Sequence, residues 1–187
     1  MSQTTKRALE ASLKNMLMKK PLSKITINDI AEDCGVSRMT VYYHFKDIYD
    51  LLEWVCEEDA RKAMAGRKTY TTWQEGFLQL LEAVLQNKTI VMNVYRSESR
   101  EQFENYLYKV TFHLLIDIVN EEAENMTVSE GDRAFIADFY KYAFVGLTLD
   151  WIKGGMKETP QSIIDRLLPL VQGNFQKALQ AYDRRIN

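Results

Sequence analysis

The 187-residue chain has little that would cross-link it, hold a metal ion or span a membrane. Its only two cysteines, Cys34 and Cys56, lack the paired spacing of a zinc site or a disulfide framework, so we expect two buried free thiols. No apolar run has the length needed to cross a bilayer, and residues 1–16 lack the apolar core of a signal peptide. We therefore expect a cytoplasmic protein with no metal, no cofactor and no membrane partner.

Histidine is also scarce, which argues against catalysis. His44 and His113 are the only two, and neither has neighbours at the spacing of a metal or catalytic site. The acidic run at Glu121, Glu122 and Glu124 is typical of a solvated helix end. The sequence thus predicts a protein that is not an enzyme and has no catalytic residues.

The chain lacks a strong excess of either charge, with a formal net charge of −2. Lysine and arginine slightly outnumber the acids up to Asp50, and the acids outnumber them beyond it. Bulk charge therefore supplies no affinity for nucleic acid, and any such affinity must come from a local surface.

Only three prolines interrupt the chain, and apolar residues recur at spacings of three and four with no clear alternating strands. This pattern predicts an all-α protein of about nine helices. The expected helices cover residues 4–20, 27–34, 37–45, 47–65, 73–86, 88–95, 99–125, 132–153 and 160–182. The first three would form an N-terminal helix-turn-helix domain, and the later ones a larger helical bundle.

The stretch "NDIAEDCGVSRMTVYYHF" (28–45) reads as two helices joined by a glycine turn at Gly35, with Ser37 as the N-cap of the second. A step of 100° per residue places Val41 and Phe45 on the inner side of that second helix. The opposite side carries Met39, Thr40, Tyr42, Tyr43 and Lys46. Such a polar and aromatic face suits the helix that a helix-turn-helix protein lays in the DNA major groove.

The chemistry of each side chain gives it an expected role on DNA. Arg38, in the first turn, suits guanine O6 and N7, while Met39 and Thr40 offer contacts to thymine methyl groups. His44 could donate to a phosphate or a base. The expected phosphate contacts are Thr26, Asn28, Ser37, Tyr42, Tyr43 and Lys46, together with amide groups at the starts of the two helices.

The segment "ITINDIAEDCGVSRMTVYYHFKDIYDLL" (25–52) resembles the DNA-binding domain of the TetR/AcrR family of bacterial transcriptional regulators. The resemblance implies a DNA-binding domain over residues 1–50, a helix over 47–65 as connector, and a regulatory and dimerisation domain over 51–187. Many members carry lysine as a phosphate anchor where this chain has Ile48. Lys46, or Lys6 and Arg7 near the N-terminus, would then substitute.

Two half-sites on a duplex are normally read by two copies of such a protein, so we expect a homodimer. By the same resemblance, the last two long helices would form the interface, although packing within one chain remains an alternative. Gly146 and Gly173 lie inside these expected helices and cost stability unless another helix approaches closely. The expected interface residues are Phe144, Gly146, Leu147, Trp151, Leu167, Leu170, Val171 and Phe175.

The middle of the chain is rich in rings, which in this family enclose an effector pocket. The expected pocket residues are Trp73, Phe77, Tyr95, Phe103, Tyr106, Phe112 and His113, although core packing explains the same residues equally well. "NVYRSESREQFENYLY" and "DFYKYAFVGLTLDWIKGGMKE" are similar to the subgroup that includes the dihydroxyacetone kinase operon regulator. That subgroup implies control through a protein co-regulator in place of a small-molecule effector.

Taken together, the sequence predicts a sequence-specific regulator that binds a double-stranded DNA operator. We expect a repressor that is relieved when a ligand or partner binds the C-terminal domain. An activator controlled by a protein partner is the first alternative, and a helical protein-interaction module without DNA binding is the second.

Overall fold

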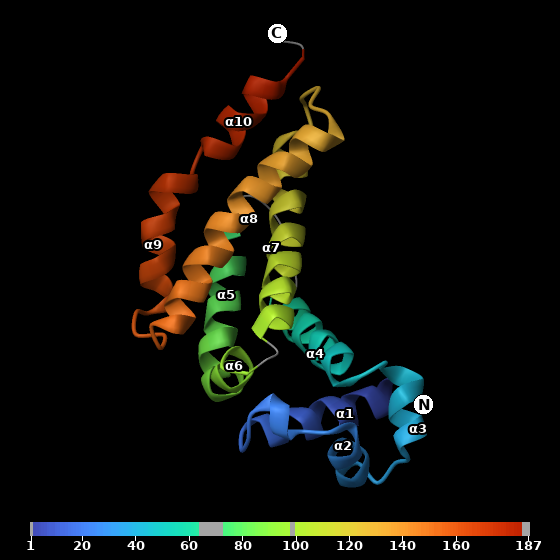
Figure 1. The fold of residues 1–187 in the computed structure, drawn as a ribbon. Coiled ribbons are helices and arrows are strands. Elements are labelled where there is room, and N and C mark those ends of the chain that lie inside the picture. Colours follow the sequence, from blue (N-terminus) through green and yellow to red (C-terminus); the bar gives the residue numbers. More distant parts are fainter. Residues whose placement is uncertain (1, 64–72, 98–99, 185–187) are drawn as a thin grey trace. The chain divides into compact units, whose positions relative to one another are not determined.

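The computed structural model describes residues 2–63, 73–97 and 100–184, and these residues form helices joined by turns, with no strand among them (Figure 1). The predicted all-α class is confirmed. The helices are α1 (Ser2–Leu17), η1 (Leu22–Lys24, a 3-10 helix), α2 (Ile27–Asp33), α3 (Arg38–His44), α4 (Ile48–Ala63), α5 (Trp73–Gln86), α6 (Lys88–Tyr95), α7 (Arg100–Glu122), α8 (Glu130–Lys153), α9 (Pro160–Val171) and α10 (Asn174–Tyr182).

The chain divides into two compact units that do not follow the order of the sequence. Unit 1 contains Met1–Asp59 and Gln86–Tyr106, and unit 2 contains Ala60–Leu85 and Leu107–Asn187. The predicted boundary at residue 50 therefore captures only part of unit 1. Helix α6 and the first residues of α7 pack with the N-terminal helices, which the linear pattern of the sequence does not indicate.

The core of unit 1 is built around α1. Leu9, Leu13 and Leu17 form one buried stripe on this helix, at the spacing that the sequence predicts. Ile30 of α2 and Val41 of α3 are also fully buried, and α2 packs against both α1 and α3. Each buried leucine stabilises the unit by about 1.5–3 kcal/mol, so α1 fixes the positions of the two short helices.

The core of unit 2 contains two groups of rings. Trp73 and Phe77 of α5 pack on Phe144 of α8, with ring centroids 5.7 and 4.7 Å apart from it. Tyr140 of α8 packs on Phe175 of α10 at 4.3 Å. Helices α9 and α10 run alongside α8 in Figure 1, which agrees with the contacts between α8 and α10.

The last predicted helix, 160–182, is wrong as a single element, because it is divided into α9 and α10. Pro169 cannot donate a backbone hydrogen bond, and α9 ends two residues later at Val171. Gly173 then adopts a left-handed conformation with φ of 74° as the N-cap of α10. This glycine serves a sharp turn, so the predicted close approach of a second helix is not needed to explain it.

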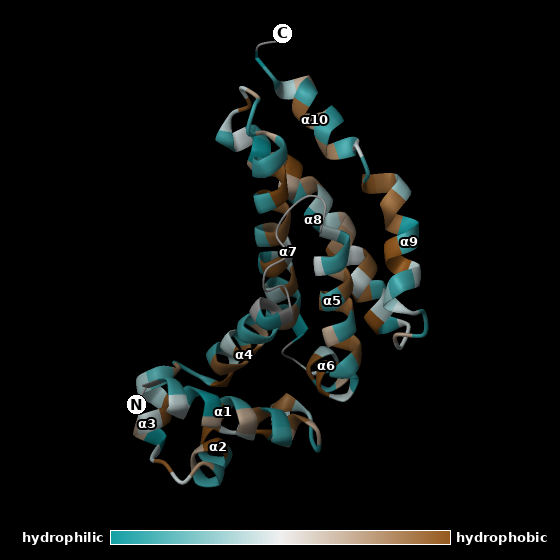
Figure 2. Ribbon diagram, turned by 180° about the vertical axis from the view of Figure 1, so that it is seen from behind, coloured by the Kyte–Doolittle hydropathy of each residue, from teal (hydrophilic) through white to brown (hydrophobic). Residues whose placement is uncertain are grey.

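No helix among the described residues is long and apolar enough to cross a membrane. Figure 2 shows hydrophilic and hydrophobic residues interspersed along the labelled helices.

Candidate nucleic-acid interface

Helix α2 begins with a reciprocal cap, for which the spacing of Thr26 and Asp29 in the sequence is typical. The Thr26 hydroxyl accepts a hydrogen bond from the Asp29 backbone amide at 3.1 Å, and the Asp29 carboxylate accepts one from the Thr26 amide at 3.0 Å. Lys20 lies 3.2 Å from the same carboxylate. The hydrogen bond from the Thr26 backbone amide lowers the pKa of Asp29, and the hydrogen bond from Lys20 lowers it further. The cap thus fixes the residue at which α2 starts.

The turn between α2 and α3 also matches its prediction. Gly35 has a φ of 64°, a conformation that glycine adopts without steric cost. The next amide, from Val36, donates to the Ala31 carbonyl at 2.9 Å and closes the turn. Ser37 then caps α3 by accepting from the Thr40 amide at 3.1 Å. These local bonds orient α3 relative to α2.

Helix α3 has a buried side and an open side, as its helical period predicts. Val41 is 0% exposed and Phe45, its C-cap residue, is 3% exposed. On the other side Tyr43 is 82% exposed, Met39 75% and Tyr42 50%. An exposed face this rich in rings has no role in the core of unit 1, so it is available to another molecule.

The remaining predicted DNA-contacting residues belong to unit 1, and none of them is fully buried. Thr26, Asn28, Ser37, Arg38 and Lys46 are exposed, and Thr40 and His44 are half-buried. The Ser37 and Thr40 hydroxyls lie 2.9 Å apart and share a hydrogen bond. The Ser37 hydroxyl thus makes this bond and the cap of α3, and its phosphate role stays a prediction.

Two carboxylates accept hydrogen bonds from backbone amides at the start of α4. The Asp47 carboxylate accepts from the amides of Tyr49 and Asp50, both at 2.9 Å, and the Asp50 carboxylate accepts from the Lys46 amide at 2.8 Å. Ile48, where many family members have lysine, lies between these two acids. Ile48 thus takes the position of the expected lysine anchor, and the carboxylates of Asp47 and Asp50 flank it in the sequence.

The Lys6 side chain is half-buried and packs against two aromatic rings. Its ammonium group lies 5.0 Å from the centroid of Phe45 and 5.3 Å from that of Trp54. The two rings are themselves 5.6 Å apart. This cation–π contact joins α1 to the end of α3 and to α4. Of the three residues expected to replace the missing lysine anchor, Arg7 and Lys46 are exposed.

With this geometry established, the chain can be compared with known proteins. Residues 11–55 match the family described as "Bacterial regulatory proteins, tetR family", and residues 71–173 match a "Transcriptional regulator C-terminal region". The chain belongs to the TetR family. Its members are DNA-binding transcriptional regulators and not enzymes, so the predictions of family, function and non-enzymatic nature are confirmed.

Two bacterial transcriptional regulators are similar to this TetR-family chain in sequence. The chain is 24% identical to the dhaKLM operon transcriptional activator DhaS of Lactococcus lactis subsp. lactis (strain IL1403), over 88% of each chain. It is also 24% identical to YerO, a regulator of Bacillus subtilis (strain 168), over 96% of this chain and 68% of YerO. The predicted likeness to the dihydroxyacetone kinase operon regulator is thus confirmed.

Solved structures show the same fold. The dihydroxyacetone kinase operon activator DhaS superimposes with a TM-score of 0.68 at 18% identity, covering 96% of this chain and 98% of that one. NalD, described as the secondary repressor of the MexAB-OprM multidrug efflux pump in Pseudomonas aeruginosa, gives 0.56 at 16% identity, covering 98% and 99%. At these identities the likeness establishes the fold of the TetR-family chain.

The structure divides the residues predicted for an effector pocket between the two units. Trp73 and Phe77 are buried in unit 2, whereas Tyr95, Phe103 and Tyr106 are buried in unit 1. In unit 2, Phe112 is half-buried and His113 is exposed. The indole Nε1 of Trp73 is buried and has no hydrogen-bond partner among the described residues. It is a buried donor that a bound acceptor would satisfy.

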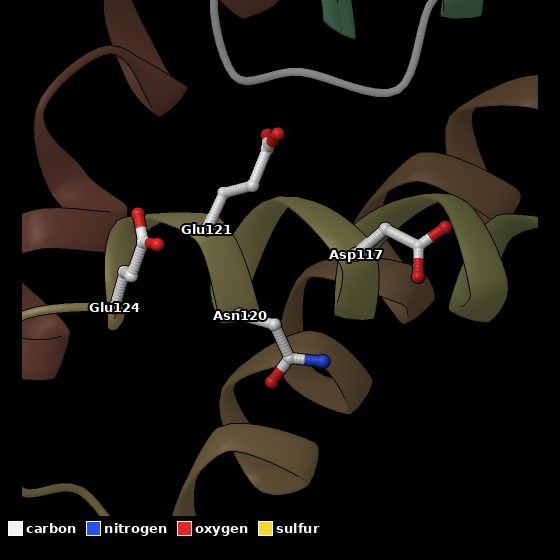
Figure 3. A pocket seen from close by; sticks show the side chains of 4 residues that line it. All are labelled: Asp117, Asn120, Glu121 and Glu124. Atoms are coloured by element: carbon white, nitrogen blue, oxygen red, sulfur yellow. The ribbon is translucent and has the colours of Figure 1, made fainter.

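A different, acidic pocket of about 510 Å³ opens at the C-terminal end of α7. It is lined by Asp117, Asn120, Glu121 and Glu124. Figure 3 shows Glu121 and Asn120 pointing to opposite sides of the helix. Asn120 accepts a hydrogen bond from Arg133 of α8 at 2.9 Å. No group of acids, histidines or cysteines in the described ranges is arranged to hold a metal ion.

The structure changes the predicted set of interface residues. Phe144 and Phe175 are 0% exposed and Val171 is 2% exposed, so packing within the protomer leaves these side chains no surface for another chain. Trp151 and Leu167 are also buried. Leu147 and Leu170 remain exposed. Gly146 is half-buried, and a methyl group on its α-carbon would meet no atom within 4 Å.

Helix α8 also carries an exposed stripe of rings that is not among the predicted interface residues. Phe135, Phe139 and Tyr142 are 62%, 65% and 60% exposed, and their spacing places them on one side of the helix with Gly146. A signal for this stripe was present in the sequence, because α8 is apolar on more than one face. A helix that is apolar on several faces is normally buried by other helices on each of those faces.

Proposed function

We propose that this TetR-family regulator is a repressor that binds its operator as a homodimer and releases it when an effector occupies unit 2. The observation that carries the DNA-binding part is the open face of α3. Residues 37–46 contain no acidic side chain, and Arg38, Tyr43 and Lys46 are all exposed there. Such a surface combines phosphate attraction with groups that can read base edges.

The stripe formed by Phe135, Phe139, Tyr142 and Gly146 supports the homodimer. Three exposed rings on one helix face are an unusual surface for a monomer, and a two-fold axis through this face would cover them with their own copies. Gly146 would allow the two α8 helices to approach closely. Leu147 and Leu170 border this face and line a groove of about 340 Å³ between α8 and α9.

The buried Trp73 indole Nε1, which has no hydrogen-bond partner within the described ranges, supports an effector in unit 2. A buried donor without an acceptor destabilises the protein by about 1–3 kcal/mol, and a ligand that supplies the acceptor recovers that free energy. Phe77 and Phe144 next to Trp73 favour a ligand with an apolar part. An effector that carries both an oxygen acceptor and an apolar group fits these residues.

Activation is the second candidate, because DhaS, to which this chain is similar over 88% of its length, is an activator. A repressor needs only to occlude the promoter, whereas an activator must also present a surface to the transcription machinery. The two are distinguished by in vitro transcription from a promoter that contains the selected operator. Added protein lowers the transcript yield in the first case and raises it in the second.

The test of DNA binding is selection of genomic fragments by the purified full-length protein, followed by titration of the selected duplex at increasing salt. A regulator that makes several phosphate contacts loses about 10³-fold or more in affinity between roughly 50 and 200 mM salt. A helical protein-interaction module would select no fragment and show no such slope. That result would overturn the proposal.

A further inference from the structure

The end of α1 has a backbone carbonyl that its own helix cannot satisfy. The carbonyl of Leu17 would normally accept from the amide four residues later, but that residue is Pro21, which has no N–H. The amides of Lys19 and Lys20 both donate to the Met16 carbonyl, at 2.9 and 3.0 Å. Leu17 is itself fully buried, so its carbonyl needs a partner from elsewhere in the protein.

Asn93 of α6 provides that partner. Its side-chain Nδ2 donates to the Leu17 carbonyl at 2.7 Å, across a separation of 76 residues in the chain. Asn93 is half-buried, and α1 and α6 are packed against each other within unit 1. An amide from α6 therefore caps the C-terminal end of α1.

Helix α1 contacts both α4 and the C-cap residue of α3, the recognition helix proposed to enter the DNA groove. At its N-terminal end, Lys6 contacts the ring of Phe45, the C-cap of α3. In its last turn, Lys14 forms ion pairs with Asp59 of α4 at 2.7 Å and with Glu10 at 2.8 Å. A shift of α1 along its axis would therefore change the positions of both α3 and α4.

Helix α6 is also directly joined to unit 2 along the chain. A single residue, Asn87, separates it from α5, which belongs to unit 2 except for its last residue and carries Trp73. We infer that Asn93 is a positioning residue through which α6 sets the place of α1, and thus of the DNA-reading face. This inference rests on the proposed DNA binding, and it assigns the regulation of that binding to the hydrogen bond between Asn93 and the Leu17 carbonyl.

The experiment measures amide hydrogen exchange of the full-length protein with and without the operator duplex selected by the wild type. Operator binding should slow exchange in α3, which tests DNA binding, and also in α6, because coupling between two sites is reciprocal. Asn93→Leu removes the amide at similar size. It should keep the protection of α3, abolish that of α6, and weaken operator binding by about three- to tenfold, as loss of one hydrogen bond predicts.

Asn93→Asp is the second variant, because it keeps the shape but places a carboxylate against the Leu17 carbonyl. It should weaken operator binding at least as much as Asn93→Leu, with a helical circular dichroism spectrum like that of the wild type. Asn120→Asp is the matched control: it adds the same charge to unit 2 and keeps the oxygen that accepts from Arg133. It should leave the affinity within twofold of the wild type.

The outcomes separate the two proposals. Protection of α3 without any protection of α6 in the wild type overturns the role of Asn93 and leaves DNA binding intact. Retention of α6 protection in Asn93→Leu also overturns it, because a merely structural residue would behave in that way. Absence of α3 protection overturns DNA binding, and the inference with it.

Discussion

At the scale of single residues, the open side of α3 shows a division of labour between side chains. Arg38 and Tyr43 are both exposed, but they differ in what they can recognise. A guanidinium group forms paired hydrogen bonds with guanine, whereas a tyrosine hydroxyl suits a phosphate oxygen. One residue should therefore affect sequence preference and the other overall affinity.

We expect Arg38→Ala to reduce the preference for operator over random duplex by about 1–3 kcal/mol, because it removes a contact to a base. Tyr43→Ala should weaken binding to both duplexes equally. Fluorescence anisotropy with both labelled duplexes measures the difference. Tyr43→Phe isolates the hydroxyl and should reproduce most of the Tyr43→Ala effect. Equal losses on both duplexes for Arg38→Ala would contradict its role in base reading.

Lys6 gives a second prediction at this scale, because the structure places it on rings and not toward DNA. Lys6→Gln should lower the free energy of unfolding by about 1 kcal/mol through loss of the cation–π contacts with Phe45 and Trp54. Urea denaturation measures this change, and Lys6→Arg should retain most of the stability. The salt slope of operator binding should stay unchanged; a slope reduced by about one would indicate a phosphate contact instead.

At the scale of elements, the short helices depend on their ends. Helix α2 has seven residues, too few to be stable by propensity alone, so its capping box matters. Thr26→Ala should destabilise the protein by about 1 kcal/mol, as loss of an N-cap does elsewhere. Thr26→Ser keeps the hydroxyl and should be close to the wild type in thermal unfolding. An unchanged melting temperature for Thr26→Ala would contradict the cap.

The same cap predicts a dependence on pH. Because its bonds lower the pKa of Asp29 in the folded state, the stabilisation is present above the unfolded pKa of about 3.9 and is lost as pH falls through the folded value. The stability difference between wild type and Asp29→Asn should therefore shrink on acidification below about pH 4. Denaturation at a series of pH values tests this, and a difference that grows on acidification would refute it.

The junction between α9 and α10 depends on a backbone conformation. Gly173 has a φ of 74° and open space around it, so a methyl group meets strain but no clash. Gly173→Ala should lower the free energy of unfolding by about 1 kcal/mol, and Gly173→Asn by less, since asparagine tolerates this region better. Chemical denaturation of both variants makes the comparison, and equal stability of Gly173→Ala and wild type would contradict it.

At the scale of the whole molecule, the exposed rings on α8 form the proposed homodimer interface. Phe139→Glu places a charge in the middle of the stripe formed with Phe135 and Tyr142, and should convert the protein from dimer to monomer. Light scattering coupled to size-exclusion chromatography measures the mass. Operator affinity should fall at least tenfold because one recognition helix then reads only one half-site.

Gln102→Glu is the control for that variant, since it adds a similar charge at an exposed position of α7. Its mass and operator affinity should match those of the wild type. A Phe139→Glu protein that remains a dimer would place the interface on another face.

The sequence by itself determined the helices, the caps of α2 and α3 and the two sides of the recognition helix. Each of these depends on bonds within a few residues or on the 3.6-residue period, so Thr26, Gly35 and Val41 behave as their local pattern predicts. The family motif lies in the same local stretch, which is why the DNA-binding function was also predictable.

Only the tertiary structure decided which apolar residues are covered and which remote residues meet. Phe144 and Phe139 are equally apolar and lie on the same helix, yet one is in the core and the other is open. Likewise, nothing near Pro21 in the sequence indicates that Asn93 completes the end of α1. Such pairings depend on how distant helices pack, and one-dimensional periodicity does not specify which helix lies against which.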